Sequence, residues 1–236
     1  MSKSPYVAVV DYGLGNTFSV QQACRHVGLM CTITSSVDEI EAATVVILPG
    51  VGAFGDAMRN LRELRLVNTL KSLAARGKPL FGICLGMQLL MTRSYEFGVV
   101  EGLNLIAGEV VRFDNPVQPP NSFSAGRALK VPQVGWNAIC LPDNVPMNHW
   151  DGSVLDSLSE GTDMYFVHSY YVIPEHEGVT LSLTSYGDVR FCSSLRQNNI
   201  FGCQFHPERS GTDGLTIYQH LADLVNSGAF SRERQM

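Results

Sequence analysis

The chain is poor in the features that would assign it to several common classes of protein. Only 17% of its 236 residues are charged and the net charge is −5, so it lacks the basic surface of a nucleic-acid-binding protein. No apolar run approaches the roughly 20 residues that cross a bilayer as a helix. We therefore expect neither nucleic acid nor membrane among its partners.

Cysteine is present, but without a recognisable framework. The six cysteines contain no C-x-x-C pair and no spacing typical of a disulfide scaffold, which favours reduced thiols. The first residues, MSKSPYVAVVDYG, lead into a strand and lack the apolar core and cleavage site of a signal peptide. We expect a cytoplasmic protein in which residues 1–236 form one domain.

Short apolar runs alternate with helical periodicity in the N-terminal part of the chain. This alternation predicts an α/β fold, with a parallel sheet covered by helices on both faces. Strand-like runs dominate after about residue 105, a long surface loop is expected at 114–133, and a last helix follows Gly214. The predicted strands are 6–10, 30–34, 44–48, 79–83, 108–113, 164–172, 179–186, 190–196 and 199–205, and the predicted helices 17–27, capped by Asn16, and 55–77.

Three loops of this pattern carry unusual chemistry. They read DYGLGN after the first strand, PGVGAFG after the third and ICLGMQ after the fourth. Ligands of open α/β sheets bind outside the carboxyl ends of the strands. The three loops therefore predict a binding site at that edge.

Cys84 lies at the corner between the strand ending in F-G-I and a predicted helix that begins at Leu85. A strand-to-helix corner exposes its residue and points it at the free N–H groups of the helix, as in a nucleophile elbow. The helix dipole favours a thiolate there, and the Leu85 N–H can serve as an oxyanion donor. A cysteine in an apolar run is more often a packing residue. Gly82 and Gly86 on either side favour the nucleophile instead, because a packing cysteine has no need of them.

A nucleophilic thiol needs a base, and His206 is the best placed of six histidines. It follows the apolar strand NIFGCQF, whose end meets the same edge as Cys84, and Pro207 stops that strand from continuing. Because residues two apart in an extended chain point the same way, we expect Glu208 to accept a hydrogen bond from the His206 ring. The combination predicts a Cys84–His206–Glu208 triad.

The glycine-rich loop PGVGAFG offers backbone N–H groups for an oxyanion hole around Val51 and Gly52. A phosphate-binding loop is the alternative, but no Lys-Ser/Thr follows these glycines. The G-L-G of the first loop also lacks the third glycine of a dinucleotide fingerprint. Nucleotide binding is therefore not expected.

The chain resembles the class I glutamine amidotransferases in its motifs G-I-C-L-G-M-Q, P-G-V-G-A-F and Q-F-H-P-E-R-S. Within that group, its motifs D-Y-G-x-G-N, V-G-W-N and Y-F-V-H-S-Y are similar to those of the HisH family, the glutaminase subunits of imidazole glycerol phosphate synthase. The motifs occur in the family's order over nearly the whole chain. The resemblance implies a flavodoxin-like α/β fold, with a mostly parallel sheet, helices on both faces and additional antiparallel strands.

The resemblance also implies a reaction. Cys84, His206 and Glu208 would hydrolyse L-glutamine to glutamate and ammonia, with Val51, Gly52 and Leu85 around the oxyanion. Ammonia would pass to a (β/α)8-barrel subunit of the HisF type, in a heterodimer that makes imidazole glycerol phosphate and AICAR in histidine biosynthesis. No metal or other cofactor is implied. The residues implied to hold glutamine are Gln88, Glu96, Ser169 and Tyr170, and those implied to face the partner are Asn16, Gln133, Trp136, Asn137, Tyr165 and Arg209.

Two positions depart from the family pattern. Gln133 precedes the V-G-W-N motif, expected as a turn, where the family usually has histidine, and Arg209 replaces the lysine that usually follows H-P-E. Arginine keeps the charge of lysine but not its geometry. The departures leave open a paralogous subunit that supplies ammonia for amidination of a bacterial cell-surface sugar. A stand-alone cysteine hydrolase is the alternative of another class.

The P-G-V-G loop also suggests a form of regulation. The peptide at Val51 can point either its carbonyl or its N–H into the site, and the adjacent glycines make the flip easy. With the carbonyl inward the oxyanion lacks a donor, which costs about a hundred- to a thousand-fold in rate. We expect slow hydrolysis by the chain alone and faster hydrolysis with the liganded partner.

Overall fold

The computed structural model describes residues 5–122 and 124–227. Its large sheet contains a parallel half, in the order β2 (Cys31–Thr34), β1 (Val7–Val10), β3 (Val45–Leu48), β4 (Leu80–Ile83) and β13 (Ile200–Cys203). This half confirms the predicted parallel arrangement. Four of these strands come from the first part of the sequence, and β13 joins them from near the C-terminal end.

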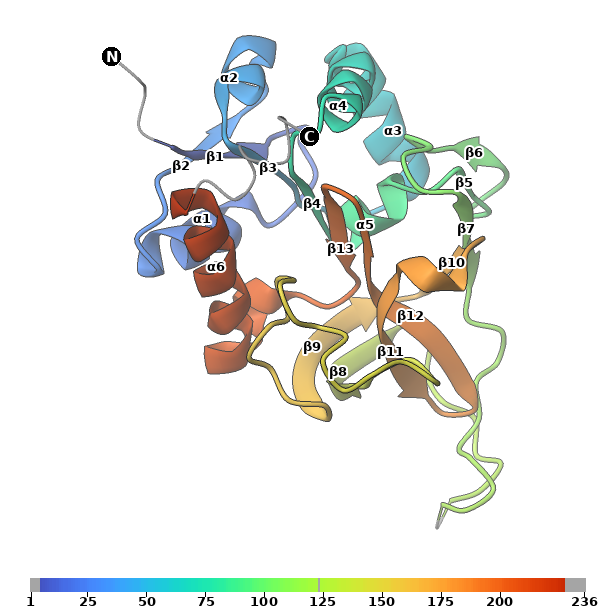
Figure 1. Ribbon diagram of the computed structural model, residues 1–236. Coiled ribbons are helices and arrows are strands. Elements are labelled where there is room, and N and C mark those ends of the chain that lie inside the picture. The colour runs from blue at the N-terminus through green and yellow to red at the C-terminus, as the bar shows by residue number, and fades with distance from the viewer. Residues whose placement is uncertain (1–4, 123, 228–236) are drawn as a thin grey trace.

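Helices cover both faces of the parallel half, as Figure 1 shows. In β1, Val7 and Val9 point into the core under α1 (Thr17–His26) and α6 (Gly211–Asn226). Ala8 and Val10 point into the opposite core. Four helices pack there: α2 (Val37–Ala42), α3 (Phe54–Glu63), α4 (Leu66–Ala75) and α5 (Leu85–Leu89). A strand buried on both faces reads as a continuous apolar run, which is how the sequence revealed it.

The other half of the sheet is mostly antiparallel. The strand β12 (Val189–Gln197) pairs with β13 and leads to β10 (Tyr170–Pro174), β7 (Gly108–Arg112), β5 (Arg93–Ser94) and β6 (Val100–Glu101), and β11 (Thr180–Tyr186) also pairs with β12. A separate ribbon consists of β8 (Gln133–Ile139) and β9 (Thr162–His168). The short 3₁₀ turns η1 (Glu177–Val179) and η2 (Pro207–Arg209) complete the elements.

Three local expectations were wrong, and one helix was missed. The helical stretch 55–77 breaks into α3 and α4 at Arg65, which adopts a left-handed φ of 59°. The run 164–172 is two strands in different sheets, and V-G-W-N lies inside strand β8 instead of forming a turn. Helix α2 was not predicted, because six residues give too little periodicity.

The last helix also begins earlier than predicted, at Gly211, so that Gly214 lies inside it. A Cβ on Gly214 would lie 2.0 Å from the carbonyl oxygen of Pro207. This glycine therefore allows α6 to approach η2 closely and does not mark the helix start.

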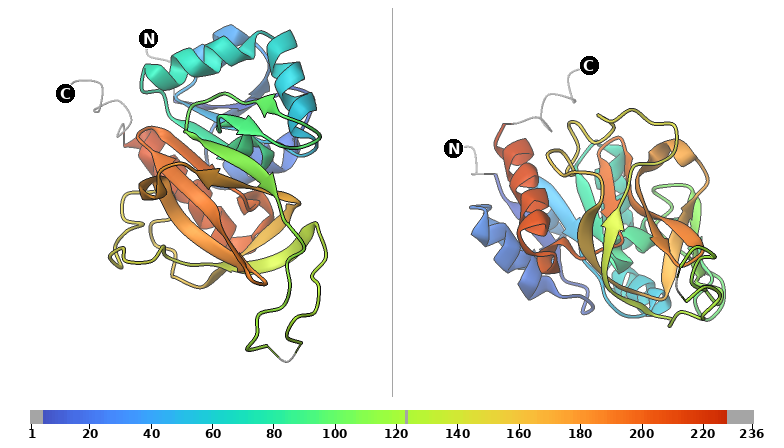
Figure 2. Two further views of the ribbon diagram at one scale, coloured as in Figure 1. Left: turned by 90° about the vertical axis from the view of Figure 1, so that its right-hand side faces the viewer. Right: turned by 90° about the horizontal axis from the view of Figure 1, so that it is seen from below.

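The long segment between β7 and β8, described except for residue 123, projects from the body of the molecule as a loop (Figure 2). This agrees with the surface loop expected at 114–133, apart from Gln133, which begins β8. Among the described residues no helix is long and apolar enough to cross a membrane.

Candidate active site

Cys84 occupies a sharp corner between β4 and α5. Its φ of 54° and ψ of −111° are strained for a residue with a side chain, and its N–H donates to the carbonyl of Cys203 at 2.7 Å. A Cβ on Gly82 would lie 2.7 Å from Gly86 O, and one on Gly86 would lie 1.7 Å from Leu48 O. Both glycines are thus required for the tight corner. The backbone has the nucleophile-elbow form that the sequence predicted.

His206 and Glu208 follow β13 at the same edge of the sheet. The imidazole Nδ1 lies 2.8 Å from Oε1 of Glu208, and the side chains of His206 and Glu208 are only 3% and 1% exposed. The expected contact between Glu208 and the His206 ring exists, but the expected cause, an extended chain from His206 to Glu208, was wrong. Glu208 lies in the turn η2 and not in an extended chain, so the turn folds the carboxylate back onto the ring.

Charge couples His206 to Cys84. Burial alone would lower the pKa of His206, but the neighbouring Cys84 and the carboxylate of Glu208 outweigh it and raise the pKa to about 10. The Nε2 atom forms no hydrogen bond of good geometry with a described residue, although Cys84 acts on the charge of the ring. A histidine in this state is an imidazolium at neutral pH. A neighbouring imidazolium favours the thiolate form of a cysteine, which is the nucleophilic form.

Gln204 contacts the thiol and had no role assigned from sequence. Its Nε2 lies 3.5 Å from Cys84 Sγ, and its Oε1 accepts from Gln88 at 3.0 Å. Gln88 also donates to the carbonyl of Tyr170 at 2.9 Å. A polar residue at the end of an apolar strand, two positions before His206, was the signal that could have revealed it. Gln204 orients both the thiol and Gln88.

A cavity of about 500 Å³ opens beside the thiol. This volume suits a small amino acid and not a macromolecule. All eight residues predicted for the oxyanion hole, the glutamine site and the nucleophile line it: Val51, Gly52, Cys84, Leu85, Gln88, Glu96, Ser169 and Tyr170.

Glu96 holds the glycine-rich loop in place. Its Oε2 accepts from the N–H of Phe54 at 2.6 Å, where α3 begins. A carboxylate at a helix N-terminus is favoured by the exposed N–H groups. Glu96 therefore links the predicted glutamine site to the loop of Val51 and Gly52.

The glycine-rich loop packs against the start of α5. A Cβ on Gly50 would lie 2.4 Å from the Tyr12 hydroxyl and 2.7 Å from Leu85 Cβ, and the same hydroxyl donates to the carbonyl of Pro49 at 2.5 Å. Gly52 has a φ of 108°. The N–H groups of Val51 and Gly52 form no hydrogen bond with any described residue. They remain available to a substrate oxyanion.

His168 lines the cavity, and it was also missed from the sequence. Its Nδ1 lies 2.9 Å from the carbonyl of Tyr170, which fixes Nδ1 as the protonated nitrogen. Burial lowers the pKa of His168 to about 3, so the ring is neutral and presents the lone pair of Nε2. Its position inside the run 164–172, expected as one strand, gave no chemical signal.

The residues expected to face a partner divide into two groups. Trp136, Tyr165 and Arg209 form a surface cluster, in which Trp136 and Arg209 are exposed and Tyr165 is half-buried. The Arg209 guanidinium lies 4.5 Å from the centre of the Tyr165 ring, and the Trp136 ring lies 6.1 Å from that ring. Gln133, in contrast, is only 2% exposed. The geometry therefore does not support direct partner contact for Gln133, which instead pairs across the ribbon with His168. Asn16 caps α1 by accepting from Ser19 N–H, as predicted.

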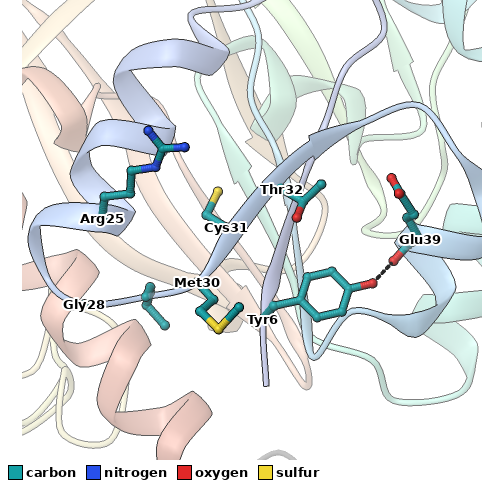
Figure 3. A pocket seen from close by; sticks show the side chains of 8 residues that line it. Tyr6, Arg25, Gly28, Met30, Cys31, Thr32 and Glu39 are labelled. Carbon is teal, nitrogen blue, oxygen red and sulfur yellow. Dashed lines mark hydrogen bonds between the residues drawn. The ribbon is translucent and has the colours of Figure 1, made fainter. Parts of the chain in front are cut away.

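A second hollow, shown in Figure 3, lies away from this site. It has a volume of about 580 Å³ and lies at the amino ends of β1 and β2, whereas Cys84 follows the carboxyl end of β4. Cys31 lines it near Arg25, and the Tyr6 hydroxyl donates to the backbone oxygen of Glu39 at 2.5 Å. The 8 residues that line it include no histidine, so it lacks the cysteine and histidine pair found at Cys84. Among the described residues no group of three or more His, Cys, Asp or Glu is placed to hold a metal ion.

Comparisons with known proteins agree with this site. The model of the family "Glutamine amidotransferase class-I" matches residues 8–221, so the chain belongs to the class I glutamine amidotransferases. A solved structure titled as a glutamine amidotransferase has the same fold, with a TM-score of 0.67 at 18% identity, over 93% of this chain and 98% of that one.

Two relatives give the particular branch of the family. The imidazole glycerol phosphate synthase subunit HisH of Moorella thermoacetica is 44% identical over 219 residues, which is 93% of this chain and 95% of that protein. The subunit HisH of Geobacter sulfurreducens is 39% identical over 218 residues, 92% of this chain and 98% of that protein. These relatives bear out the resemblance to the HisH family.

Proposed function

We propose that this chain is the glutaminase subunit of an imidazole glycerol phosphate synthase and supplies ammonia for histidine biosynthesis. The observation that carries the proposal is the buried Cys84–His206–Glu208 constellation beside a cavity of about 500 Å³. The identity of 39–44% to relatives named HisH supports the pathway. The whole chain would then form one amidotransferase domain.

The first chemical step forms a thioester. The Cys84 thiolate attacks the side-chain carbonyl carbon of glutamine, and the developing oxyanion accepts hydrogen bonds from Leu85 and from the free N–H groups near Val51 and Gly52. The carbon–nitrogen bond then breaks as the His206 imidazolium gives its proton to the leaving amide nitrogen. Ammonia and a γ-glutamyl thioester on Cys84 result.

Loss of the thiolate charge drives the proton transfer. Burial has the largest effect on the pKa of His206 and lowers it. The negative charge of Cys84 is the largest of the effects that raise this pKa. When the sulfur becomes acylated this charge disappears, so the pKa of His206 falls and the ring gives up its proton. The neutral ring then removes a proton from water, which attacks the thioester. Glutamate leaves and the ion pair is restored.

Ammonia must leave this site neutral, because protonated ammonium is no nucleophile. We assign the receiving partner as a (β/α)8-barrel synthase subunit of the HisF type, bound as a heterodimer. The surface cluster of Trp136, Tyr165 and Arg209 supports a docking surface, since aromatic and arginine side chains are typical of binding hot spots. The free Val51–Gly52 peptide, which no described hydrogen bond fixes, supports gating by that partner.

Copurification with the barrel subunit and an assay of its product test the proposal. We expect the copurified complex to form imidazole glycerol phosphate when glutamine is supplied. We also expect the rate of glutamine hydrolysis to rise when partner and acceptor are added. Amination of a surface sugar by the copurified partner would contradict the pathway. Full glutaminase activity of the isolated chain would contradict the gating.

A further inference from the structure

Helix α6 places a buried tyrosine against the turn that carries Glu208. Tyr218 is 0% exposed and belongs to the same core as Cys203 and Phe205 of the neighbouring strand end. A tyrosine buried completely brings a hydroxyl into an apolar region, where it needs a partner. The reaction described above gives Tyr218 no role.

The geometry of α6 directs this side chain toward η2. Gly214, one helical turn before Tyr218, faces the turn so closely that a Cβ there would lie 2.0 Å from Pro207 O. Side chains on a helix lean toward its N-terminus and cover the turn before their own Cα. This geometry directs the Tyr218 ring toward the surface of Gly214, on the side of Pro207 and its neighbour Glu208, and the charge of Glu208 acts on Tyr218.

Two buried polar atoms in this region lack partners among the described residues. They are the hydroxyl of Tyr218 and Oε2 of Glu208, the carboxylate oxygen that His206 does not use. The hydroxyl is a donor and the carboxylate oxygen an acceptor, so each can satisfy the other. Buried polar groups in folded proteins are nearly always satisfied, directly or through a bridging water.

The electrostatics agree with this pairing. Burial raises the pKa of Tyr218 well above its ordinary value, and the negative charge of Glu208 is the largest charge effect in the same direction. The hydroxyl therefore keeps its proton throughout the working range of pH. It can only act toward Glu208 as a donor.

We propose that Tyr218 is a positioning residue of the triad, whose hydroxyl donates to Oε2 of Glu208 directly or through one water and holds the carboxylate in line with His206. This inference rests on the proposed function. Glu208 then has both oxygens engaged, one on the imidazole and one on the tyrosine. A carboxylate held at both ends cannot rotate away from the ring.

The test compares Tyr218→Phe with Tyr6→Phe. Both remove one hydroxyl from a tyrosine, but Tyr6 precedes β1 and donates to Glu39 O, so it makes no contact with the triad. In the complex with the partner subunit, Tyr218→Phe should lower the kcat for glutamine hydrolysis about five-fold at unchanged KM, the worth of one hydrogen bond. An NMR titration should show a higher pKa for His206. Without the hydrogen bond from Tyr218, the Glu208 carboxylate keeps more of its negative charge, and this charge stabilises the imidazolium. Tyr6→Phe should change neither.

Equal kcat and equal His206 pKa in the two variants would overturn the proposal. A lower kcat without a change in the pKa of His206 would mark a purely structural role and would also overturn the proposal. A change in the pKa of His206 without any loss of kcat would overturn it as well. If Tyr218→Phe fails to fold, a high-resolution crystal structure of the wild type decides: the tyrosine hydroxyl must lie on Oε2 or share a water with it. Absence of glutaminase activity in the wild-type complex would refute the proposed function instead, and the titration and crystal structure would still test the Tyr218 bond.

Discussion

The cysteines of the chain other than Cys84 differ in how readily their thiols can react. Burial raises the pKa of Cys192 to about 12 and that of Cys203 well above its ordinary value, so both stay protonated. Cys31 is half-buried, and its hydrogen bond from Cys24, with help from Arg25, lowers its pKa despite burial. Cys31 is therefore the rival thiol for a general electrophile, but it has no glutamine site.

We predict that a diazo-oxo-norleucine adduct forms on Cys84 and on no other cysteine, because this glutamine analogue needs the cavity as well as a thiolate. Peptide mass spectrometry measures the site of labelling. Iodoacetamide, which needs only a reactive thiol, serves as the control and should also label Cys31. An analogue adduct on Cys31, Cys192 or Cys203 would contradict the assignment of the nucleophile.

His168 gives a prediction about stability and pH. Its pKa is lowered to about 3 by burial, from an ordinary value of 6.5, so between these values the unfolded chain binds one proton more than the folded chain. The free energy of unfolding should therefore fall as the pH drops below 6.5, by up to about 1.4 kcal/mol per pH unit from this group.

Urea unfolding between pH 6.5 and 4.5 measures this dependence. The variant His168→Gln should flatten the acid side of the stability profile, whereas His26→Gln, at an exposed position, should leave it unchanged. An equally steep fall in His168→Gln would show that the ring is not held neutral in the folded chain.

At the scale of elements, the junction of β4 and α5 depends on glycine. The variant Gly86→Ala would place a methyl group 1.7 Å from the carbonyl oxygen of Leu48, on rigid backbone. We predict a loss of stability of at least about 2 kcal/mol, with displacement of α5 and loss of glutaminase activity. Gly178→Ala is the control. A Cβ there has no neighbour within 4 Å, so this variant should lose little free energy of unfolding. Denaturant unfolding of both variants gives the comparison, and a Gly86→Ala variant as stable as the control would contradict the tight packing at the corner.

The elements also show how far sequence alone reaches. Strands β1 and β3 are predicted well, because burial on both faces leaves runs such as V-A-V-V and V-V-I-L. The cysteine corner is predictable because its glycines mark a close approach. The break at Arg65 is not, since an arginine in a left-handed conformation follows from the packing of α3 and α4 and not from local preference.

The candidate site divides in the same way. The motif residues Cys84, His206 and Glu208 could be found because their residue types carry chemistry. Gln204 follows the apolar strand β13 and His168 is the last residue of β9. Only the folded chain shows that their side chains reach the thiol and the cavity wall. Burial of Gln133 is likewise set by the pairing of β8 with β9, which a turn at V-G-W-N would not allow.

At the scale of the whole molecule, one edge of the sheet gathers Cys84, His206 and the loop of Val51 and Gly52 from segments far apart in sequence. The cavity at this edge is bordered by His168 of the ribbon strand β9, and β9 also carries Tyr165 of the surface cluster. A partner that docks on the ribbon thus touches an element of the cavity wall. Under the proposed function, this continuity is the route by which we expect partner binding to affect glutamine hydrolysis.

The central claim is that Cys84 releases ammonia from glutamine for use by a separate subunit. The most direct measurement is product formation by the complex of the barrel subunit with wild-type chain or with Cys84→Ala, supplied with either glutamine or an ammonium salt. The account predicts that Cys84→Ala loses glutamine-dependent synthesis by several orders of magnitude and keeps ammonia-dependent synthesis. Glutamine-dependent synthesis that survives in Cys84→Ala, or ammonia-dependent synthesis that is lost with it, would contradict the account.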